Sequence, residues 1–184
     1  TGTGSGSVPS GLTNTTLEGF LSVAPTAILD GTETTNSLTW NFNSGTEAFD
    51  FLADGETLIL TYTVSVTDNN STPANDTETV IVTITGTNDA PTIAVVDVVG
   101  AVTEDTATPT LTDSGSLTFA ELDATDVISS SVAISSTATT GPAIPTGLAT
   151  ALNSALSLTQ TGTNDGSIAW GFTVANSLTQ YLAD

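Results

Sequence analysis

The sequence contains no lysine, arginine, histidine, cysteine or methionine, whereas aspartate and glutamate together number 20 in 184 residues. The formal net charge is therefore −20. A chain of average composition and this length would carry roughly twenty lysines and arginines. Without cysteine, disulfide bonds and thiolate metal sites are excluded. Because the usual nucleophile–base pairs of covalent catalysis also need histidine, lysine or cysteine, we predict that the protein is not an enzyme.

The lack of positive charge also restricts the partners of the chain. Proteins neutralise nucleic-acid phosphates with lysine and arginine, and basic segments attract them to anionic membrane surfaces. A membrane-spanning helix needs about 18 apolar residues, and the longest candidate run, residues 93–102, is interrupted by Asp97. We therefore predict no nucleic-acid partner and no membrane insertion. Because the carboxylates repel one another, we expect divalent cations or salt from solution to stabilise the compact state.

The residues that are present indicate an all-β protein. Hydrophobic residues make up 38% of the chain and occur mostly as Val, Ile, Leu and Phe in short alternating runs, separated by Thr, Ser, Gly and Asn. The predicted strands lie in residues 38–42, 58–66, 78–85, 92–99, 115–121, 127–134, 154–159 and 167–174. Residues 146–156 could form a short helix. Short strands between turn-forming clusters predict Ig-like or cadherin-like β-sandwich modules.

Two parts of the chain resemble each other. Residues 36–54 match residues 166–184, so that Trp40 corresponds to Trp170 at a separation of 130 positions (170 − 40). Upstream, VPSGL at residue 8 matches IPTGL at residue 144, a separation of 136 positions (144 − 8). We therefore predict tandem modules, with residues 1–90 as the later part of one module and residues 91–184 as the earlier part of the next. The two modules would meet at a joint formed by residues 86–93.

The two repeated tryptophans allow two interpretations. An exposed tryptophan could stack on sugar rings and would favour a carbohydrate-binding module. However, Trp40 and Trp170 each alternate in register with apolar neighbours, which is typical of core positions. We therefore predict that both side chains are buried.

Acidic and amide side chains form several candidate clusters, the first of which lies at the predicted joint. In GTNDAPTI, Pro91 restricts the backbone behind Asn88 and Asp89, which indicates a stiff connector rich in oxygen atoms. Hard oxygen ligands of this kind bind calcium. The predicted Ca2+ ligands are Asn88, Asp89, Glu104 and Asp105 at the joint, Asp123 and Asp126 in a second cluster, and Asp68 if the strand at residues 58–66 ends near the joint. The alternative is that these acids are solvated or form Asx-turns that shape the loops.

Four linked motifs carry a resemblance to a known family. They are LADGETLILTYTVSVTDNN, ETVIVTITGTNDAPTI, TEDT and LTDSGSLTFAELDATD. Together they resemble the VCBS repeat, a tandem module of very large secreted bacterial proteins, including RTX-type adhesins. The resemblance implies an Ig-like or cadherin-like β-sandwich, calcium binding and secretion. One departure is Glu121, which stands where the usual motif has aspartate.

These features together predict an extracellular or cell-surface bacterial protein. We expect a calcium-stiffened spacer of a large adhesin or biofilm matrix protein, with neighbouring modules of the same or an identical chain as partners. Cell-surface or matrix glycans are further candidate partners. One alternative is the subunit of an extracellular filament that assembles head to tail by β-strand complementation. A second alternative is the carbohydrate-binding module.

Overall fold

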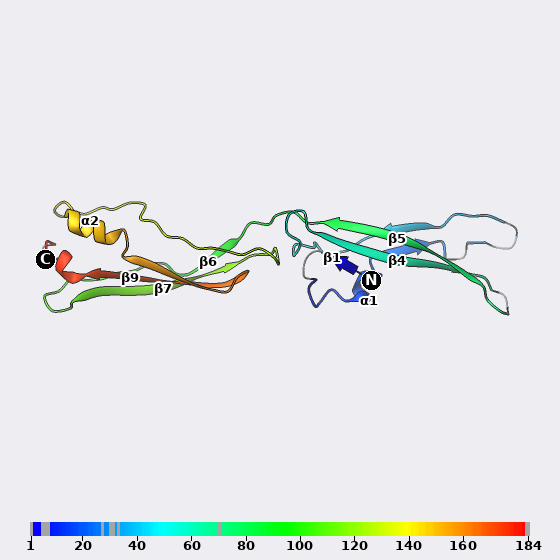
Figure 1. The fold of residues 1–184 in the computed structure, drawn as a ribbon, viewed down its shortest axis with the longest axis horizontal. Helices are drawn as coiled ribbons and strands as arrows, with labels where there is room; N and C mark the ends of the chain where they lie inside the picture. The colour runs from blue at the N-terminus through cyan, green and yellow to red at the C-terminus, as the bar shows by residue number, and fades with distance from the viewer. Residues whose placement is uncertain are drawn as a thin grey trace. The chain divides into compact units, whose positions relative to one another are not determined.

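The computed structural model describes residues 2–4, 8–26, 28–29, 32, 34–69 and 71–182. Its regular structure consists mostly of antiparallel strands with a few short helices, which confirms the all-β class (Figure 1). The chain divides into two compact units. Unit 1 consists of Thr1–Asp89 and Leu122–Thr125, and unit 2 consists of Ala90–Glu121 and Asp126–Asp184. The division between Asp89 and Ala90 falls inside the predicted joint.

Unit 1 contains two antiparallel sheets. The first has the strand order β1-β4-β5 and is formed by β1 (Gly2–Gly4), β4 (Thr57–Thr67) and β5 (Asn75–Thr85). The second is a hairpin of β2 (Leu21–Ala24) and β3 (Thr39–Phe42). A short helix, α1 (Asn14–Glu18), precedes β2, and the side chain of Thr13 caps it by accepting a hydrogen bond from the Thr16 N–H.

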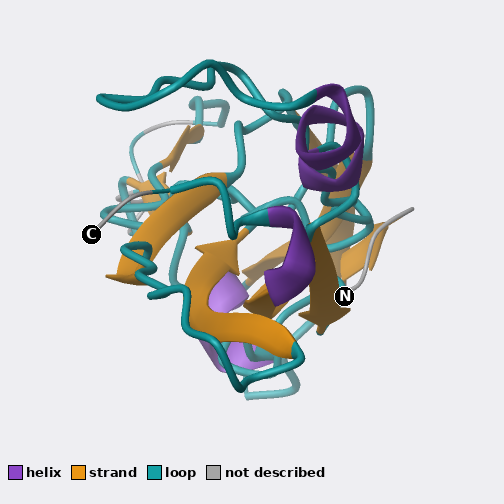
Figure 2. Cartoon of the chain, turned by 90° about the vertical axis from the view of Figure 1, so that its left-hand side faces the viewer, coloured by secondary structure: helices purple, strands orange, loops and turns teal. Residues whose placement is uncertain are grey.

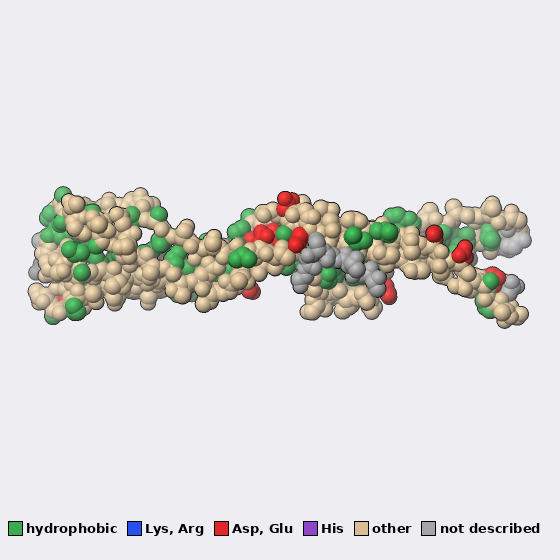
Figure 3. All heavy atoms as spheres, viewed as in Figure 1, with side chains coloured by type: hydrophobic (Ala, Val, Ile, Leu, Met, Phe, Trp, Pro, Cys, Tyr) green, Lys and Arg blue, Asp and Glu red, His purple; other side chains and the backbone are tan. Residues whose placement is uncertain are grey.

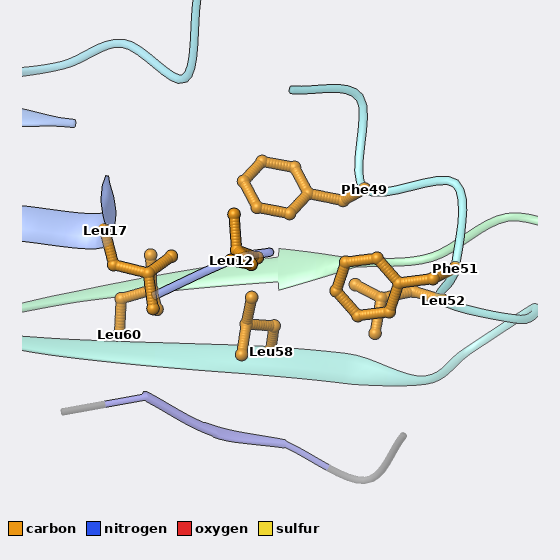
Figure 4. Packing of buried hydrophobic residues seen from close by; sticks show 7 residues of the cluster. All are labelled: Leu12, Leu17, Phe49, Phe51, Leu52, Leu58 and Leu60. Atoms are coloured by element: carbon orange, nitrogen blue, oxygen red, sulfur yellow. The ribbon is translucent and has the colours of Figure 1, made fainter. Parts of the chain in front are cut away.

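The core of unit 1 forms around one face of β4. Because side chains alternate along a strand, Leu58 and Leu60 point to the same side and are almost completely buried. Figure 4 shows them with the other core residues, which are Leu12, Leu17, Phe49, Phe51 and Leu52. Two residues further along the same face, the Tyr62 hydroxyl donates to the Leu17 carbonyl at 2.8 Å. Partial burial raises the pKa of Tyr62, so this hydroxyl remains a donor.

Unit 2 contains a single four-stranded antiparallel sheet with the order β6-β7-β9-β8. Its strands are β6 (Thr92–Asp97), β7 (Thr110–Ala120), β8 (Leu156–Thr161) and β9 (Asp165–Ala175). The helical parts are α2 (Thr146–Leu152) and the 3-10 turn η1 (Asn176–Leu178). The core cluster beside α2 is smaller than that of unit 1 and contains Leu111, Leu148 and Val174. Figure 2 shows the strands, with the long loop that leads into α2 in teal.

One predicted strand is absent. The structure confirms seven expected strands, with shifted ends, as β3 to β9; they were predicted at residues 38–42, 58–66, 78–85, 92–99, 115–121, 154–159 and 167–174. The short helix expected within residues 146–156 is confirmed as α2, which ends at Leu152. Residues 127–134, however, form loop. Although apolar and polar residues alternate in this segment, the apolar side chains are not buried: Val132 is 44% exposed and Ile134 is 47% exposed. A strand needs a neighbour to pair its backbone N–H and C=O groups, and no described strand pairs with this segment. The Ile128 N–H donates instead to the Thr163 carbonyl at 3.1 Å.

The matching segments of sequence form matching hairpins. In β2–β3, Leu21 pairs with Phe42 and Val23 pairs with Trp40. In β8–β9, Leu156 pairs with Phe172 and Leu158 pairs with Trp170. The two hairpins therefore share one register, in which equivalent apolar residues occupy the same face.

The two equivalent tryptophans nevertheless differ in burial. Trp170 is 8% exposed, as predicted, whereas Trp40 is 53% exposed and the prediction of a core position for it is wrong. Trp170 lies on the central strand β9 and covers Gly115 of β7, where a Cβ atom would come within 2.6 Å of its ring. Its Nε1–H also donates to the Asp97 carbonyl at 2.6 Å. Among the described residues, β3 pairs with β2 alone, so Trp40 has no equivalent of β7 beside it.

Candidate functional site

The candidate site is built around a short loop, Leu122–Thr125, which we call the Asp123 loop. Although both flanking segments belong to unit 2, the loop itself lies in unit 1. The Ala124 N–H donates to the Phe51 carbonyl at 3.1 Å, and the Thr125 hydroxyl donates to Glu56 Oε1 at 3.0 Å. These bonds hold the loop against the turn that leads into β4.

Asp123 is the central residue of this loop. It is 0% exposed, and its Oδ2 accepts a hydrogen bond from the Asp89 N–H at 2.8 Å. Its second oxygen, Oδ1, is buried and accepts no hydrogen bond among the described residues, although other contacts also hold the residue. Beside it, the Asn88 side chain donates to the Asp89 carbonyl at 2.9 Å. The structure thus brings Asp123 onto the predicted joint, whereas the sequence placed Asp123 and Asp89 in separate acidic clusters.

Glu56 belongs to the same site but was not among the predicted ligands. Its Oε2 accepts from the Ala53 N–H at 3.1 Å, while its carbonyl accepts from the Gly86 N–H at 2.8 Å. Gly86, the first residue of the joint, approaches Leu52 so closely that a Cβ atom would lie 2.1 Å from the Leu52 carbonyl oxygen. The sequence feature that could have indicated Glu56 is the Asp-Gly turn of ADGET. This turn directly precedes β4, and Gly86 directly follows β5 at the same end of the sheet.

The electrostatics of the site follow from the composition of the whole chain. A buried carboxylate is costly unless hydrogen bonds and a positive charge compensate it. The sequence has no lysine, arginine or histidine, and Figure 3 accordingly shows red acidic side chains but no blue or purple ones on the face in view. Glu121, directly before the loop, is buried as well, at 9% exposure. The chain therefore has no cationic side chain to place beside Asp123.

Asp68 lies at the opposite end of β4 from Glu56. Its N–H donates to the Ala74 carbonyl and its Oδ1 accepts from the Ala74 N–H, both at 3.0 Å, so that it closes the loop between β4 and β5. With a rise of about 3.3 Å per residue, the 11 residues of β4 span roughly 35 Å. This placement corrects the grouping of Asp68 with the joint, because a single ion cannot bridge that distance.

Asp126 and the pair Glu104 and Asp105 lie within unit 2. The Asp126 carbonyl accepts from the Asn164 side chain at 2.9 Å. Glu104 accepts from the Gln180 side chain at 2.9 Å. The Asp105 carboxylate accepts hydrogen bonds from Thr108 and from the Ala107 N–H, as in an Asx-turn, and the buried side chain of Asn176 donates to its carbonyl. Asp105 therefore shapes the loop before β7.

The hydrogen bonds to Asp105 predict an effect of pH. The side-chain and backbone bonds from Thr108, with that from Ala107, hold the pKa of Asp105 below the ordinary value of 3.8. The stabilisation of this loop is therefore present above that value and is lost as the pH falls through the lowered pKa. We expect Thr108→Val to raise the pKa of Asp105, as measured by its carboxyl chemical shift in an NMR titration. Thr112→Val, an exposed change further along β7, should leave it unchanged; an unaltered titration in Thr108→Val would contradict the assignment.

Two surveys of the described part of the chain complete the site. Within it, no group of three or more acidic side chains comes together as a metal-binding cluster. Nor does that part contain a helix long and apolar enough to cross a membrane. A comparison of the chain with protein-family models, curated proteins and solved structures finds no match.

Proposed function

We propose that this chain is a spacer segment of a large extracellular bacterial adhesin or matrix protein. It consists, in this proposal, of tandem Ig-like β-sandwich modules whose joint at residues 86–93 is stabilised by Ca2+. The observation that carries the proposal is Asp123, a fully buried carboxylate that accepts a hydrogen bond from the joint in a chain without any cationic side chain. The VCBS-like motifs around the joint, GTNDAPTI and ELDATD, support the same conclusion.

The donor set at the joint suits calcium. Calcium binds six to eight oxygens from carboxylates, carbonyls, amides and water in flexible geometry. The residues that would hold it are Asp123, Asp89 and Asn88, all of them in unit 1. When bound, the ion supplies the positive charge that the chain itself lacks. The hydrogen bond from Ala124 to Phe51 already fixes the loop, so the ion adds to a contact that the chain itself makes.

Ion binding at this place would stiffen a spacer. The Asp123 loop and residues 86–89 are far apart in the sequence, and each is followed directly by a segment of unit 2. A ligand that binds only the folded joint stabilises it by about 2.7 kcal/mol at a hundred times its dissociation constant. In this mechanism the joint is loose at low calcium concentration and becomes ordered outside the cell.

The exposed Trp40 would also suit the carbohydrate-binding alternative. Its exposure has a simpler cause, however, because β3 pairs with β2 alone among the described residues while the equivalent Trp170 is buried beside β7. An open strand edge of this kind is instead typical of a partial module. We therefore retain the spacer as the proposed function.

The test is a thermal melt in chelator and then in millimolar calcium, with magnesium and with sodium chloride at matched ionic strength. We expect calcium to stabilise unit 1 more than the other salts do, by about 2–3 kcal/mol near saturation. Asp123→Asn keeps the shape and an acceptor for Asp89 but removes the charge, and should abolish the calcium-specific part.

The matched control for this melt is Asp76→Asn, because it makes the same change in net charge. Asp76 is exposed on β5, at the end that pairs with Val66. The calcium-specific increment should survive in this variant. An equal increment in both variants, or an equal response to every salt, would show general charge screening and would refute the calcium joint.

A further inference from the structure

Unit 2 contains a large apolar hollow on one face of its sheet. The cavity measures about 790 Å³ and lies between the sheet and residues 128–132. From the sheet it is lined mainly by Leu117, Phe119, Leu156, Leu158, Ile168 and Phe172. Protein interiors seldom leave empty spaces larger than a water molecule. The sheet face is therefore incompletely covered.

Unit 1 shows what covers the equivalent face. There, Leu21 and Val23 of β2 lie opposite residues 60–65 of β4 across a smaller hollow. Because β2–β3 and β8–β9 share one register, Leu156 and Leu158 are the equivalents of Leu21 and Val23. Both line the large cavity of unit 2. The cavity therefore occupies the place where β4 lies in unit 1.

The exposure of repeated residues agrees with this comparison. Leu52, which packs against β4, is 1% exposed, whereas its equivalent 130 positions later (182 − 52), Leu182, is 40% exposed. In contrast, Leu12 and its equivalent Leu148 are both buried, at 8% and 5%. Burial is lost at the position that β4 covers in unit 1 and is kept at the position beside the helix.

The residues equivalent to β1 are also unpaired in unit 2. In unit 1, β1 pairs with β4 at Gly2–Gly4. The separation of 136 positions between VPSGL and IPTGL makes residues 138–140 the equivalents of β1. Residues 138–140 form no strand in unit 2. They lack the neighbour that β4 provides in unit 1.

We propose that the apolar face of unit 2 is the docking surface of a β-hairpin of the β4–β5 type in the same polypeptide, because β4 and β5 cover the equivalent face of unit 1. Such a hairpin presents alternate Leu, Tyr and Val side chains to the cavity and mostly Thr and Ser to solvent. In the register of β1 with β4, its first strand pairs with residues 131–140, and its apolar face covers Leu156, Leu158 and Leu182. The inference is independent of calcium and concerns how a module is completed.

The test extends the full chain by a second copy of its own residues 55–86, placed after Asp184. We expect amide hydrogens of residues 131–140 to exchange at least about tenfold more slowly, because they gain strand hydrogen bonds. Binding of a dye that reports exposed apolar surface should fall several-fold as the cavity is filled.

The control extension carries Leu58→Asn and Leu60→Asn in the added copy alone, so that its length and charge are unchanged. It should leave the amide exchange of residues 131–140 as it is in the unextended chain. Equal protection with both extensions, or none with either, would overturn the proposal. So would a concentration-dependent dimer of the unextended chain that protects residues 131–140, because the occupant would then be a second copy.

Discussion

Replacing Trp170 by alanine is expected to destabilise unit 2 by about 3 kcal/mol or more, since truncation of a buried tryptophan typically costs roughly 3–5 kcal/mol. Trp170 is 8% exposed, packs over Gly115 and donates its Nε1–H to the Asp97 carbonyl. The change removes both the packing and the hydrogen bond between β9 and the end of β6. Amide exchange of β7 and β9 in increasing urea measures the effect on unit 2 directly.

The internal repeat supplies the matched control for this prediction. Trp40→Ala makes the same chemical change at the equivalent register position of β3, where the side chain is 53% exposed. A surface change of this kind should cost about 1 kcal/mol or less. Similar losses in the two variants, each measured on its own unit, would contradict the difference in packing between β3 and β9.

Leu58→Ala is expected to destabilise unit 1 by about 2–5 kcal/mol, because it opens a cavity in the core. Leu58 is 0% exposed and belongs to the cluster that joins β4 to Leu12, Leu52 and Phe51. The free energy of unfolding is obtained from amide exchange of β4 and β5, with β7 and β9 as an internal reference in the same sample.

Ile59→Ala is the control for Leu58→Ala. Ile59 is the next residue of β4, points to the opposite side of the strand and is 37% exposed, so its truncation should cost much less. A larger loss in Ile59→Ala than in Leu58→Ala would mean that β4 buries its other face.

The candidate site was only partly predictable. The acids of GTNDAPTI and ELDATD stand out in the sequence, but nothing local to either motif indicates that the Asp123 carboxylate accepts a hydrogen bond from the Asp89 N–H, because the two residues are 34 positions apart. Glu56 contacts the Asp123 loop through its hydrogen bond from Thr125. In the sequence, the Asp-Gly turn before Glu56 indicates only a turn. Asp68 was grouped with the joint because the direction of β4 relative to the joint is not encoded by its alternation.

The sequence by itself determined the all-β class, the positions of most strands and the absence of any cation able to balance a buried carboxylate. These properties depend on residue type and on a period of two along the backbone, which are both local. Only the tertiary structure decided that Trp170 is buried while Trp40 is exposed, and that residues 127–134 remain loop. The physical reason is that burial and strand pairing require a neighbouring strand. Similar segments of sequence therefore differ in structure where one of them has such a neighbour and the other does not.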